Sequence, residues 1–407
     1  MASAFGSALR REVRFLATSF WDLALVSWVP LLLMAVVAIQ LSAGVMRGLP
    51  IAVVDQDDSA VSRELTRRLE AAPGLRVAAR PGDMREAERL VRSNRAYAVV
   101  LIPADSERAV LRGTTASITT FYNASYSTAS GAALREVGSV VQSYAATLAA
   151  TQAAAVLGPG KVRRPPIAVQ STVLFNPQGS YELQLVALIH PALLHLIFMV
   201  AVAGALGREL RDGTIGDWIG EEPRLRAAAA VAGKLAPYLA IFTGWGLLAI
   251  GYAAGLRGWP VAGSVAMLLA GYVAMYLAYV GVTLLVVGLT LTMGKALSVA
   301  GLYAGASFAF AGAIFPIESA SGFARLWSAL LPYSAFARLL AEQWIMGAPA
   351  GQSLWQILAM LAFLLVGGGI GLPRYLAAAR RPIISGPSFP AAPSSPPSVR
   401  SSPTARH

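Results

Sequence analysis

The sequence predicts an α-helical polytopic membrane protein with six transmembrane helices and an inserted extracytoplasmic α/β domain between spans one and two. Three observations support this prediction. Of the 407 residues, 56% are hydrophobic and only 13% are charged, a balance typical of membrane proteins. Long apolar runs recur along the chain, and each is close to the roughly 20 residues that a helix needs to cross a bilayer. Between the first two runs, the composition changes to that of a soluble domain.

Residues 1–22 are predicted to form a cytoplasmic interfacial helix. Apolar side chains recur there at helical spacing beside three arginines, a pattern typical of a helix that lies in the membrane surface. The apolar positions are Phe5, Leu9, Val13, Leu16 and Phe20, and the basic ones are Arg10, Arg11 and Arg14. A basic tail ahead of a signal anchor is the alternative. The first span follows at residues 23–46, and the arginines before it place the N-terminus inside.

Residues 47–180 are predicted to fold as an α/β domain, because strand and helix patterns alternate along them. The predicted strands are 51–54, 75–79, 97–102 and 117–122, and the predicted helices are 59–70, 84–95, 105–111 and 130–157. Since one inside-to-outside span precedes this domain, we expect it on the extracytoplasmic side of the membrane.

Residues 181–373 are predicted to hold the other five spans, at 183–206, 227–256, 261–292, 296–314 and 354–372. Lysine and arginine fall mainly in the short loops that this topology places inside, with both termini cytoplasmic. An outer re-entrant segment at 316–352 is expected to carry two short amphipathic helices. The Pro/Ser-rich tail, residues 374–407, is predicted to be disordered.

One polar stretch, residues 207–223, separates the second and third spans, and we name it the elbow. A charge cluster between two spans cannot lie in lipid, so the sequence predicts a water-exposed turn. Asp212-Gly213 is a helix-stopping pair, and Thr214 with Asp217 matches a capping box that would begin a new helical turn. Such a rigid bend at a membrane face is suited to receiving force from another protein. The alternative is a solvated loop that follows the positive-inside rule.

Arg208-Glu209 followed by Gly213-Thr214 resembles the cytoplasmic loop of ABC exporter permeases of the ABC-2 type. Further matches to that family occur in order along almost the whole chain apart from the tail. They are Val53-Val54-Asp55-Gln56-Asp57 with Ser59, Phe175-Asn176-Pro177, Gly233-Lys234-Leu235 with Pro237-Tyr238, and Phe315-Pro316-Ile317-Glu318-Ser319 with Leu331-Pro332. Each match is short, but their order and their spacing relative to the apolar runs make the set specific.

The resemblance implies the membrane-spanning subunit of an ATP-driven exporter in the bacterial cytoplasmic (inner) membrane, for drug-like, lipid or other amphiphilic cargo. It implies two such chains, as a homo- or heterodimer, a separate ABC ATPase subunit that docks on the elbow, and room for a membrane-fusion adaptor. The coupling residues would be Arg208, Glu209, Arg211, Gly213, Thr214 and Asp217, and the outer gate would be Phe315, Pro316 and Glu318. After Thr214 the chain departs from the family pattern, which leaves the particular ATPase partner open.

The chain carries no motif for nucleotide chemistry. None of its three Gly-Lys pairs has the surrounding glycine and Ser/Thr of a phosphate-binding loop. We therefore expect ATP and Mg²⁺ on the partner ATPase, with no cofactor bound by this chain and no enzymatic activity of its own. The absence of cysteine excludes disulfides and thiolate metal sites. The net charge of +12 comes from scattered residues, many beside span ends, so nucleic acid is not an expected partner.

Two histidines, His190 and His195, lie in the second span, where polar groups are costly. Their spacing does not suit one shared metal ion, and no carboxylate lies nearby, so no metal site is predicted. A hydrogen bond between helices is the favoured interpretation, and a proton relay or substrate contact is the alternative. For the whole chain, the alternative function is a membrane receptor or anchor without a motor, similar to phage receptors with a large outer domain. The intact elbow argues against it, because an anchor needs no loop that receives force.

Overall fold

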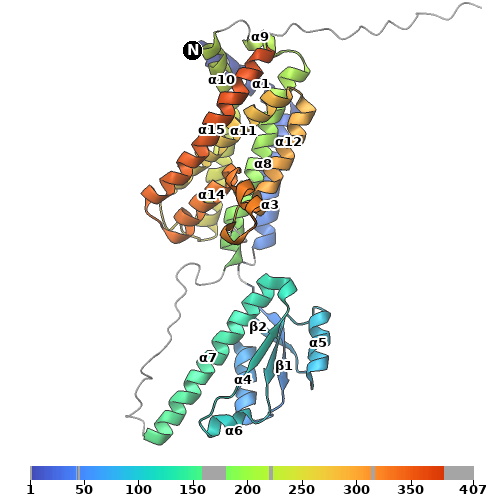
Figure 1. Cartoon of the computed structure of the whole chain (residues 1–407), viewed down its shortest axis with the longest axis vertical. Helices are drawn as coiled ribbons and strands as arrows, with labels where there is room; N and C mark the ends of the chain where they lie inside the picture. Colours follow the sequence, from blue (N-terminus) through green and yellow to red (C-terminus); the bar gives the residue numbers. More distant parts are fainter. Residues whose placement is uncertain are drawn as a thin grey trace, which may run out of the picture. The chain divides into compact units, whose positions relative to one another are not determined.

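The chain divides into two compact units. The computed structural model describes residues 2–42, 44, 46–157, 180–219, 223–312 and 317–379. One unit is formed by Met1–Leu33, Pro191–Gly251 and Val261–His407, and the other by Met34–His190 and Tyr252–Pro260. The described part of the first unit is built from helices, and the second contains a four-stranded sheet (Figure 1).

Three successive helices open the chain: α1 (Ala2–Thr18), α2 (Phe20–Val26) and α3 (Trp28–Leu41). The hydroxyl of Ser19, between the first two, donates a hydrogen bond of 2.6 Å to the Asp22 carboxylate. The apolar stretch that is long enough to cross a membrane is Phe20–Leu41. The predicted interfacial helix therefore ends earlier than residue 22, and the candidate span begins before residue 23.

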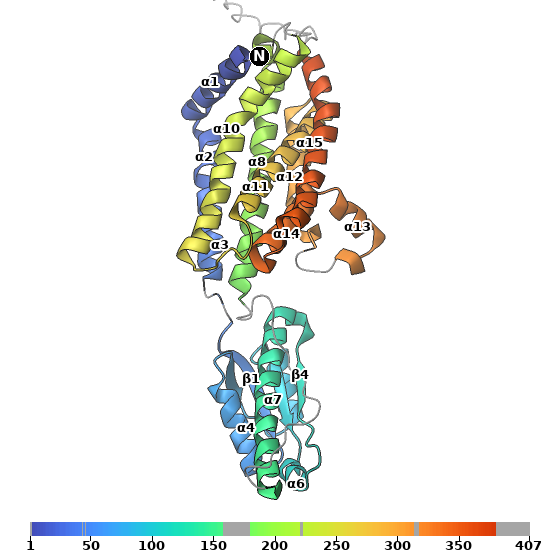
Figure 2. The ribbon, with the colours of Figure 1, turned by 90° about the vertical axis from the view of Figure 1, so that its left-hand side faces the viewer.

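The rest of the helical framework follows the inserted sheet. It comprises α8 (Tyr181–Arg211), α9 (Ile215–Ile219), α10 (Arg224–Ile250), α11 (Val265–Thr290), α12 (Met293–Phe310), α13 (Gly322–Ala329), α14 (Pro332–Leu340) and α15 (Ala350–Ala378). Two π-helical turns, Gly251–Leu256 and Ala341–Met346, continue α10 and α14. Figure 2 shows the long helices α8, α10, α11, α12 and α15 running alongside one another.

Five helices in the described part of the chain are long and apolar enough to cross a membrane, whereas the sequence predicts six spans. The five are Phe20–Leu41, Glu182–Arg211, Arg224–Leu256, Val265–Thr290 and Ala350–Ala378. The helix at the predicted fifth span, α12, is not among them. It is 18 residues long, and its lysine, serines and glycines lower its hydropathy. The structure thus shows a polytopic helical membrane protein.

Glycines allow two pairs of helices in the first unit to approach closely. A Cβ added at Gly288 on α11 would lie 2.4 Å from the carbonyl oxygen of Gly371 on α15, and one at Gly367 would lie 2.5 Å from that of Gly281. Helix α1 lies along α10 (Figure 2), and a Cβ at Gly233 would lie 2.3 Å from the carbonyl oxygen of Phe5. Any larger side chain at these positions would force the helix backbones apart.

The sheet of the second unit has the strand order β2-β1-β3-β4. Its strands are β1 (Leu49–Asp55), β2 (Leu75–Ala79), β3 (Ala98–Ile102) and β4 (Thr119–Tyr122), connected by α4 (Ala60–Ala71), α5 (Met84–Arg92) and α6 (Ser106–Leu111) and followed by α7 (Ser127–Leu157). β1 pairs in parallel with β2 and β3, and β4 pairs antiparallel to β3. The strands lie where the residue pattern predicts them, because β-branched apolar runs alternate with capped amphipathic helices.

Both faces of this sheet bury apolar side chains. Ile51 and Val53 of β1 join a core that includes residues of α4 and α7, whereas Ala52 and Val54 point to the opposite face, where α5 packs. This alternation follows from the two-residue period of a strand. Ser59 caps the N-terminus of α4 by accepting a hydrogen bond from the Ser62 backbone N–H. The sequence match at 175–177 lies outside the described residues.

Candidate functional site

Charged side chains from three helices meet inside the first unit. Two of these residues, Arg208 and Glu209, belong to the elbow, which the sequence predicts to be a water-exposed turn. We name Glu12 of α1, Arg208 and Glu209 of α8, and Lys234 and Tyr238 of α10 the buried charge cluster. Glu209 and Lys234 are each only 2% exposed. The predicted second span ends at residue 206, but α8 continues to Arg211. The elbow's first charged residues are therefore helical, and protein covers them in place of water.

Glu12 is the acceptor at the centre of the cluster. Its Oε1 atom accepts hydrogen bonds of 2.7 Å from Arg208 Nη2 and from the Tyr238 hydroxyl. Its Oε2 atom accepts one from Lys234 Nζ. A buried carboxylate is costly unless it is paired and hydrogen-bonded. These three donors replace the hydrogen bonds to water that Glu12 loses on burial, and they join α1 to both α8 and α10.

Lys234 connects the two carboxylates of the cluster. Its Nζ atom lies 2.7 Å from Glu209 Oε1 and is also bonded to Glu12. Two carboxylates and two cations, Lys234 and Arg208, balance in this arrangement. The second oxygen of Glu209 accepts from Arg11 at 3.0 Å and from the Thr214 hydroxyl. The ammonium group thus ties the last turn of α8 to the first turns of α10.

Aromatic side chains and one further carboxylate surround the cluster. The Arg208 guanidinium lies 3.5 Å from the centre of the Phe15 ring, and its Nη1 atom lies 3.3 Å from Asp22 Oδ1. The Trp218 ring lies 5.6 Å from the Arg11 guanidinium and 5.4 Å from Lys234 Nζ. Such cation–π contacts suit partly desolvated cations. They attach α9, the short helix within the elbow, to the same group of charges.

Local sequence explains how these groups converge. Lys234 and Tyr238 are four residues apart on α10, so both point from one face of that helix. Gly233 beside them lets the α1 backbone approach α10, because a side chain there would meet the Phe5 carbonyl oxygen. Glu12 is the only acidic residue of α1, and it lies on the side that faces α10. In the Gly233-Lys234 pair, the glycine therefore allows the contact between α1 and α10, and the lysine ammonium is bonded to carboxylates.

The elbow bends where the sequence predicts it, but its threonine has a different role. α8 ends at Arg211, a turn follows, and Gly213 adopts a positive φ of 70°, which glycine tolerates. The Thr214 hydroxyl bonds to Glu209 and not to the Asp217 backbone N–H, which instead donates to the Thr214 carbonyl oxygen at 3.1 Å. The buried carboxylate outcompetes the capping contact because a charged acceptor binds the hydroxyl more strongly.

The predicted coupling residues therefore divide into two groups. Arg208, Glu209 and Thr214 point into the cluster, whereas Arg211 and Asp217 are exposed. Arg211 forms hydrogen bonds of 2.7 and 3.1 Å with Asp212. These bonds lower the pKa of the Asp212 carboxyl below its usual value. The inward group is bonded to other helices, whereas the outward group faces away from the cluster.

The two histidines of α8 contact backbone oxygens on other helices. His190 Nε2 lies 3.1 Å from the Met34 carbonyl oxygen of α3, within the second unit. His195, in the first unit, lies 3.3 Å from the Ala304 carbonyl oxygen of α12 through Nε2. The His195 ring is stacked between Tyr279 and Tyr333, with centroids 4.6 and 4.7 Å away. No group of three or more metal-ligating side chains is found among the described residues.

Two of the three predicted gate residues, Phe315 and Pro316, lie outside the described residues. The third, Glu318, lies in the short 3₁₀ turn Ile317–Ser319 that precedes α13.

Sequence reasoning missed the cluster's partners on α1 and α10. It assigned no role to Glu12 and took Lys234 as a residue of a family match. One signal was present. Lys234 lies inside the apolar run predicted as the third span, 227–256, where a charge requires a partner of opposite sign.

The helices define a multi-pass membrane protein in which buried charges join α1, the end of α8 and α10. Comparison with known families then gives its class. The family model described as ABC-2 family transporter protein matches residues 20–372. The chain belongs to this family, as its sequence motifs predict, and is a membrane component of an ABC transporter. That family implies a separate ATPase subunit. No curated protein and no solved structure matches the chain. Helix α1 precedes the matched stretch.

Proposed function

We propose that the chain is the permease subunit of an ATP-driven exporter, and that the buried charge cluster transmits movement from the elbow to the spans. The observation that supports this proposal is the placement of Glu209 in a chain of the ABC-2 family. It lies at the base of the elbow and is bonded to α10 through Lys234 and to the turn through Thr214.

The cluster would act as a rigid joint. A force on the exposed residues Arg211 and Asp217 would act on the last turn of α8 and on α9. Because Glu209 and Lys234 are paired in a buried, low-dielectric setting, displacing one of them alone would leave an uncompensated charge, which costs roughly 3–5 kcal/mol. The ends of α8 and α10 would therefore move together. Glu12 extends the same constraint to α1.

ATP and Mg²⁺ would bind on the separate ATPase subunit. The residues of this chain do not fit a phosphate-binding loop. Gly233-Lys234 lies inside α10, where the glycine touches α1 and the ammonium is held by two carboxylates. Gly294-Lys295 lies in the first turn of α12, an apolar helix without the required preceding glycine. ATP would thus be hydrolysed on the partner subunit, and this chain would respond by a change of conformation.

The elbow and both termini would face the cytoplasm, and the sheet-containing domain would lie on the other side of the inner membrane. In this topology α12 crosses the bilayer as a sixth span. Two chains would form the path for drug-like, lipid or other amphiphilic cargo, with a gate at Phe315, Pro316 and Glu318. The exposed apolar side chains on the outer faces of the spans support a membrane-embedded dimer or lipid contact. A membrane-fusion adaptor would meet the outer domain.

Reconstitution tests this function. Proteoliposomes containing the chain and its ATPase subunit should move a fluorescent phospholipid analogue or a lipophilic dye only when ATP is supplied on the elbow side. Proteoliposomes with either subunit alone are the control. The proposal fails if the chain moves these probes equally well without the ATPase, or if the complete, ATP-hydrolysing complex moves none of a panel of amphiphiles.

A further inference from the structure

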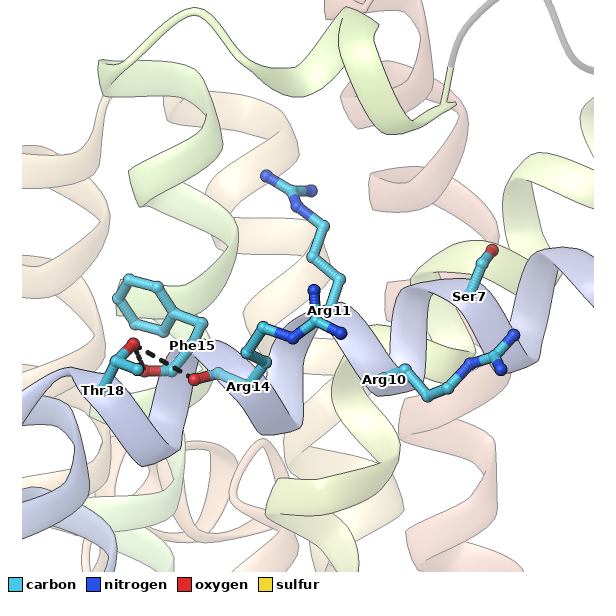
Figure 3. Close-up of a pocket in the computed structure, with 6 residues that line it drawn as sticks. All are labelled: Ser7, Arg10, Arg11, Arg14, Phe15 and Thr18. Atoms are coloured by element: carbon cyan, nitrogen blue, oxygen red, sulfur yellow. Dashed lines mark hydrogen bonds between the residues drawn. The ribbon is translucent and has the colours of Figure 1, made fainter.

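Helix α1 presents a basic face on the side away from the cluster. Ser7, Arg10, Arg14 and Thr18 follow one another at intervals of three or four residues, so they lie on one side of the helix. Together with Arg11 and Phe15 they line an open pocket of about 530 Å³ (Figure 3). The view shows the guanidinium groups of Arg10 and Arg14 spread along this side of the helix.

Two of the three arginines that line this pocket, Arg10 and Arg14, have no carboxylate partner among the described residues. Arg10 and Arg14 are both exposed. Arg10 donates only to the Gly6 carbonyl oxygen of its own helix, at 3.3 Å, and neither residue is paired with a carboxylate among the described residues. Arg11 is bonded to Glu209, but its side chain is still 43% exposed. The face therefore offers two unpaired guanidinium groups and the outer edge of a third.

The position of this face relative to the bilayer follows from the residues after it. Thr18 ends α1, and the candidate span begins at Phe20. Phe20 and Trp21 are 72% and 80% exposed. Exposed tryptophan rings at the start of a span lie at the depth of the lipid headgroups. One end of the basic face thus reaches the headgroup layer.

The opposite side of α1 fixes the orientation of this face. Glu12 is bonded to Arg208, Lys234 and Tyr238, and α1 touches α10 at Gly233. The helix cannot rotate its arginines away without breaking these buried contacts. The cationic groups are therefore held at the membrane surface before any ligand arrives.

We propose that the basic face of α1 binds the phosphate of an anionic phospholipid headgroup between Arg10 and Arg14. Guanidinium groups match phosphate oxygens with paired hydrogen bonds. A lipid would cover both the basic face and the exposed aromatic side chains after it. Its phosphate would reach the arginines while the rest of the molecule contacts Phe20 and Trp21. An acidic soluble protein would leave those two aromatic side chains uncovered. A bound lipid would hold α1 against α10 and so support the cluster from outside.

Fluorescence titration in nanodiscs tests this proposal, which does not depend on the ATPase. Because the chain has no cysteine, Ala17→Cys gives a single labelling site on α1 beside the pocket. The labelled full chain is placed in phosphatidylcholine nanodiscs containing 0 to about 30 mol% phosphatidylglycerol. Each basic residue near an anionic surface contributes about a fivefold gain in affinity, so Arg10→Gln with Arg14→Gln should weaken the response about 25-fold. The double variant should then fail to saturate over this range.

The matched control removes the same charge elsewhere. Arg224→Gln with Arg374→Gln replaces exposed arginines at the ends of α10 and α15. It should change the titration less than twofold if the site is specific. Equal curves for the two double variants, or no response to phosphatidylglycerol, would overturn the proposal. Inorganic phosphate giving the same saturation in pure phosphatidylcholine would show a free-anion site instead. A double variant that keeps its lipid response but loses ATPase binding would assign the face to the protein partner.

Discussion

Glu209 Oε1 lies 2.7 Å from Lys234 Nζ, and this pair joins the end of α8 to the beginning of α10. Both side chains are almost completely buried. Glu209 belongs to the elbow and Lys234 lies inside α10, so the pair connects the elbow to the third predicted span. Glu12 completes the pairing from α1, which makes the joint a contact among three helices.

Lys234→Met should destabilise the first unit strongly. It leaves Glu12 and Glu209 buried with their charges only partly compensated, and breaking such a buried pair costs roughly 3–5 kcal/mol. Lys295→Met is the matched control, because Lys295 is exposed on α12. Thermal unfolding of the purified chain in detergent should show a clear fall in Tm for Lys234→Met and little change for Lys295→Met. Equal Tm values would show that the pair does not stabilise the fold.

Arg211→Glu should weaken binding of the ATPase subunit without loosening the chain. Arg211 is exposed, and its carboxylate partner among the described residues is Asp212, so the pair contributes at most about 1 kcal/mol to stability. Reversing a charge at the rim of an interface mainly slows association and changes its salt dependence. Arg374→Glu, at the end of α15, provides the control. Surface plasmon resonance with immobilised ATPase would measure the association rate of each variant. An unchanged rate for Arg211→Glu would show that the elbow is not part of the docking surface.

The segment 46–157 should fold without the rest of the chain, and Leu69→Ala should destabilise it by about 2–5 kcal/mol. Leu69 is fully buried between α4 and the sheet, so truncation leaves a cavity. Leu111→Ala is the control, since Leu111 is 76% exposed. Urea unfolding followed by circular dichroism gives the difference. A segment that remains unfolded in the absence of the membrane helices would contradict this prediction.

Single cysteines should report opposite sides of the membrane for the sheet-containing domain and the elbow. Ser143 on α7 and Asp217 on α9 are both exposed. In intact spheroplasts, Ser143→Cys should react with an impermeant maleimide and Asp217→Cys should react only after lysis. The reverse labelling pattern would invert the topology on which the transport direction depends.

The long membrane-spanning helices other than α12 could be located from the sequence, because their apolar runs are long enough to cross a bilayer. The predicted span 227–256 corresponds to Arg224–Leu256, and the predicted break at Asp212-Gly213 is where α8 ends. α12 shows the limit of this reasoning. Its composition falls between that of a span and that of a buried helix, and local sequence does not decide between them.

The cluster could be predicted only in part. Lys234 lies inside a predicted span and Glu209 lies 25 residues before it, so opposite charge suggests their pairing. Glu12 is 222 residues from Lys234, and packing of α1 on α10 brings them together. Thr214 was assigned to a helix cap because capping is a local pattern. Its bond to Glu209 depends on the burial of that carboxylate, which local sequence does not reveal.

The measurement that tests the account most directly is cargo-stimulated ATP hydrolysis by the reconstituted complex with Glu209→Gln. This variant keeps the side-chain shape but removes the charge that holds Lys234, so the ATPase should still bind and hydrolyse ATP. Cargo stimulation and transport per ATP should fall about tenfold, within the 1–3 kcal/mol typical of coupling between sites. Asp212→Asn, on the exposed side of the elbow, should keep both. Normal stimulation and transport in a folded Glu209→Gln complex would contradict the role of the buried charge cluster in coupling.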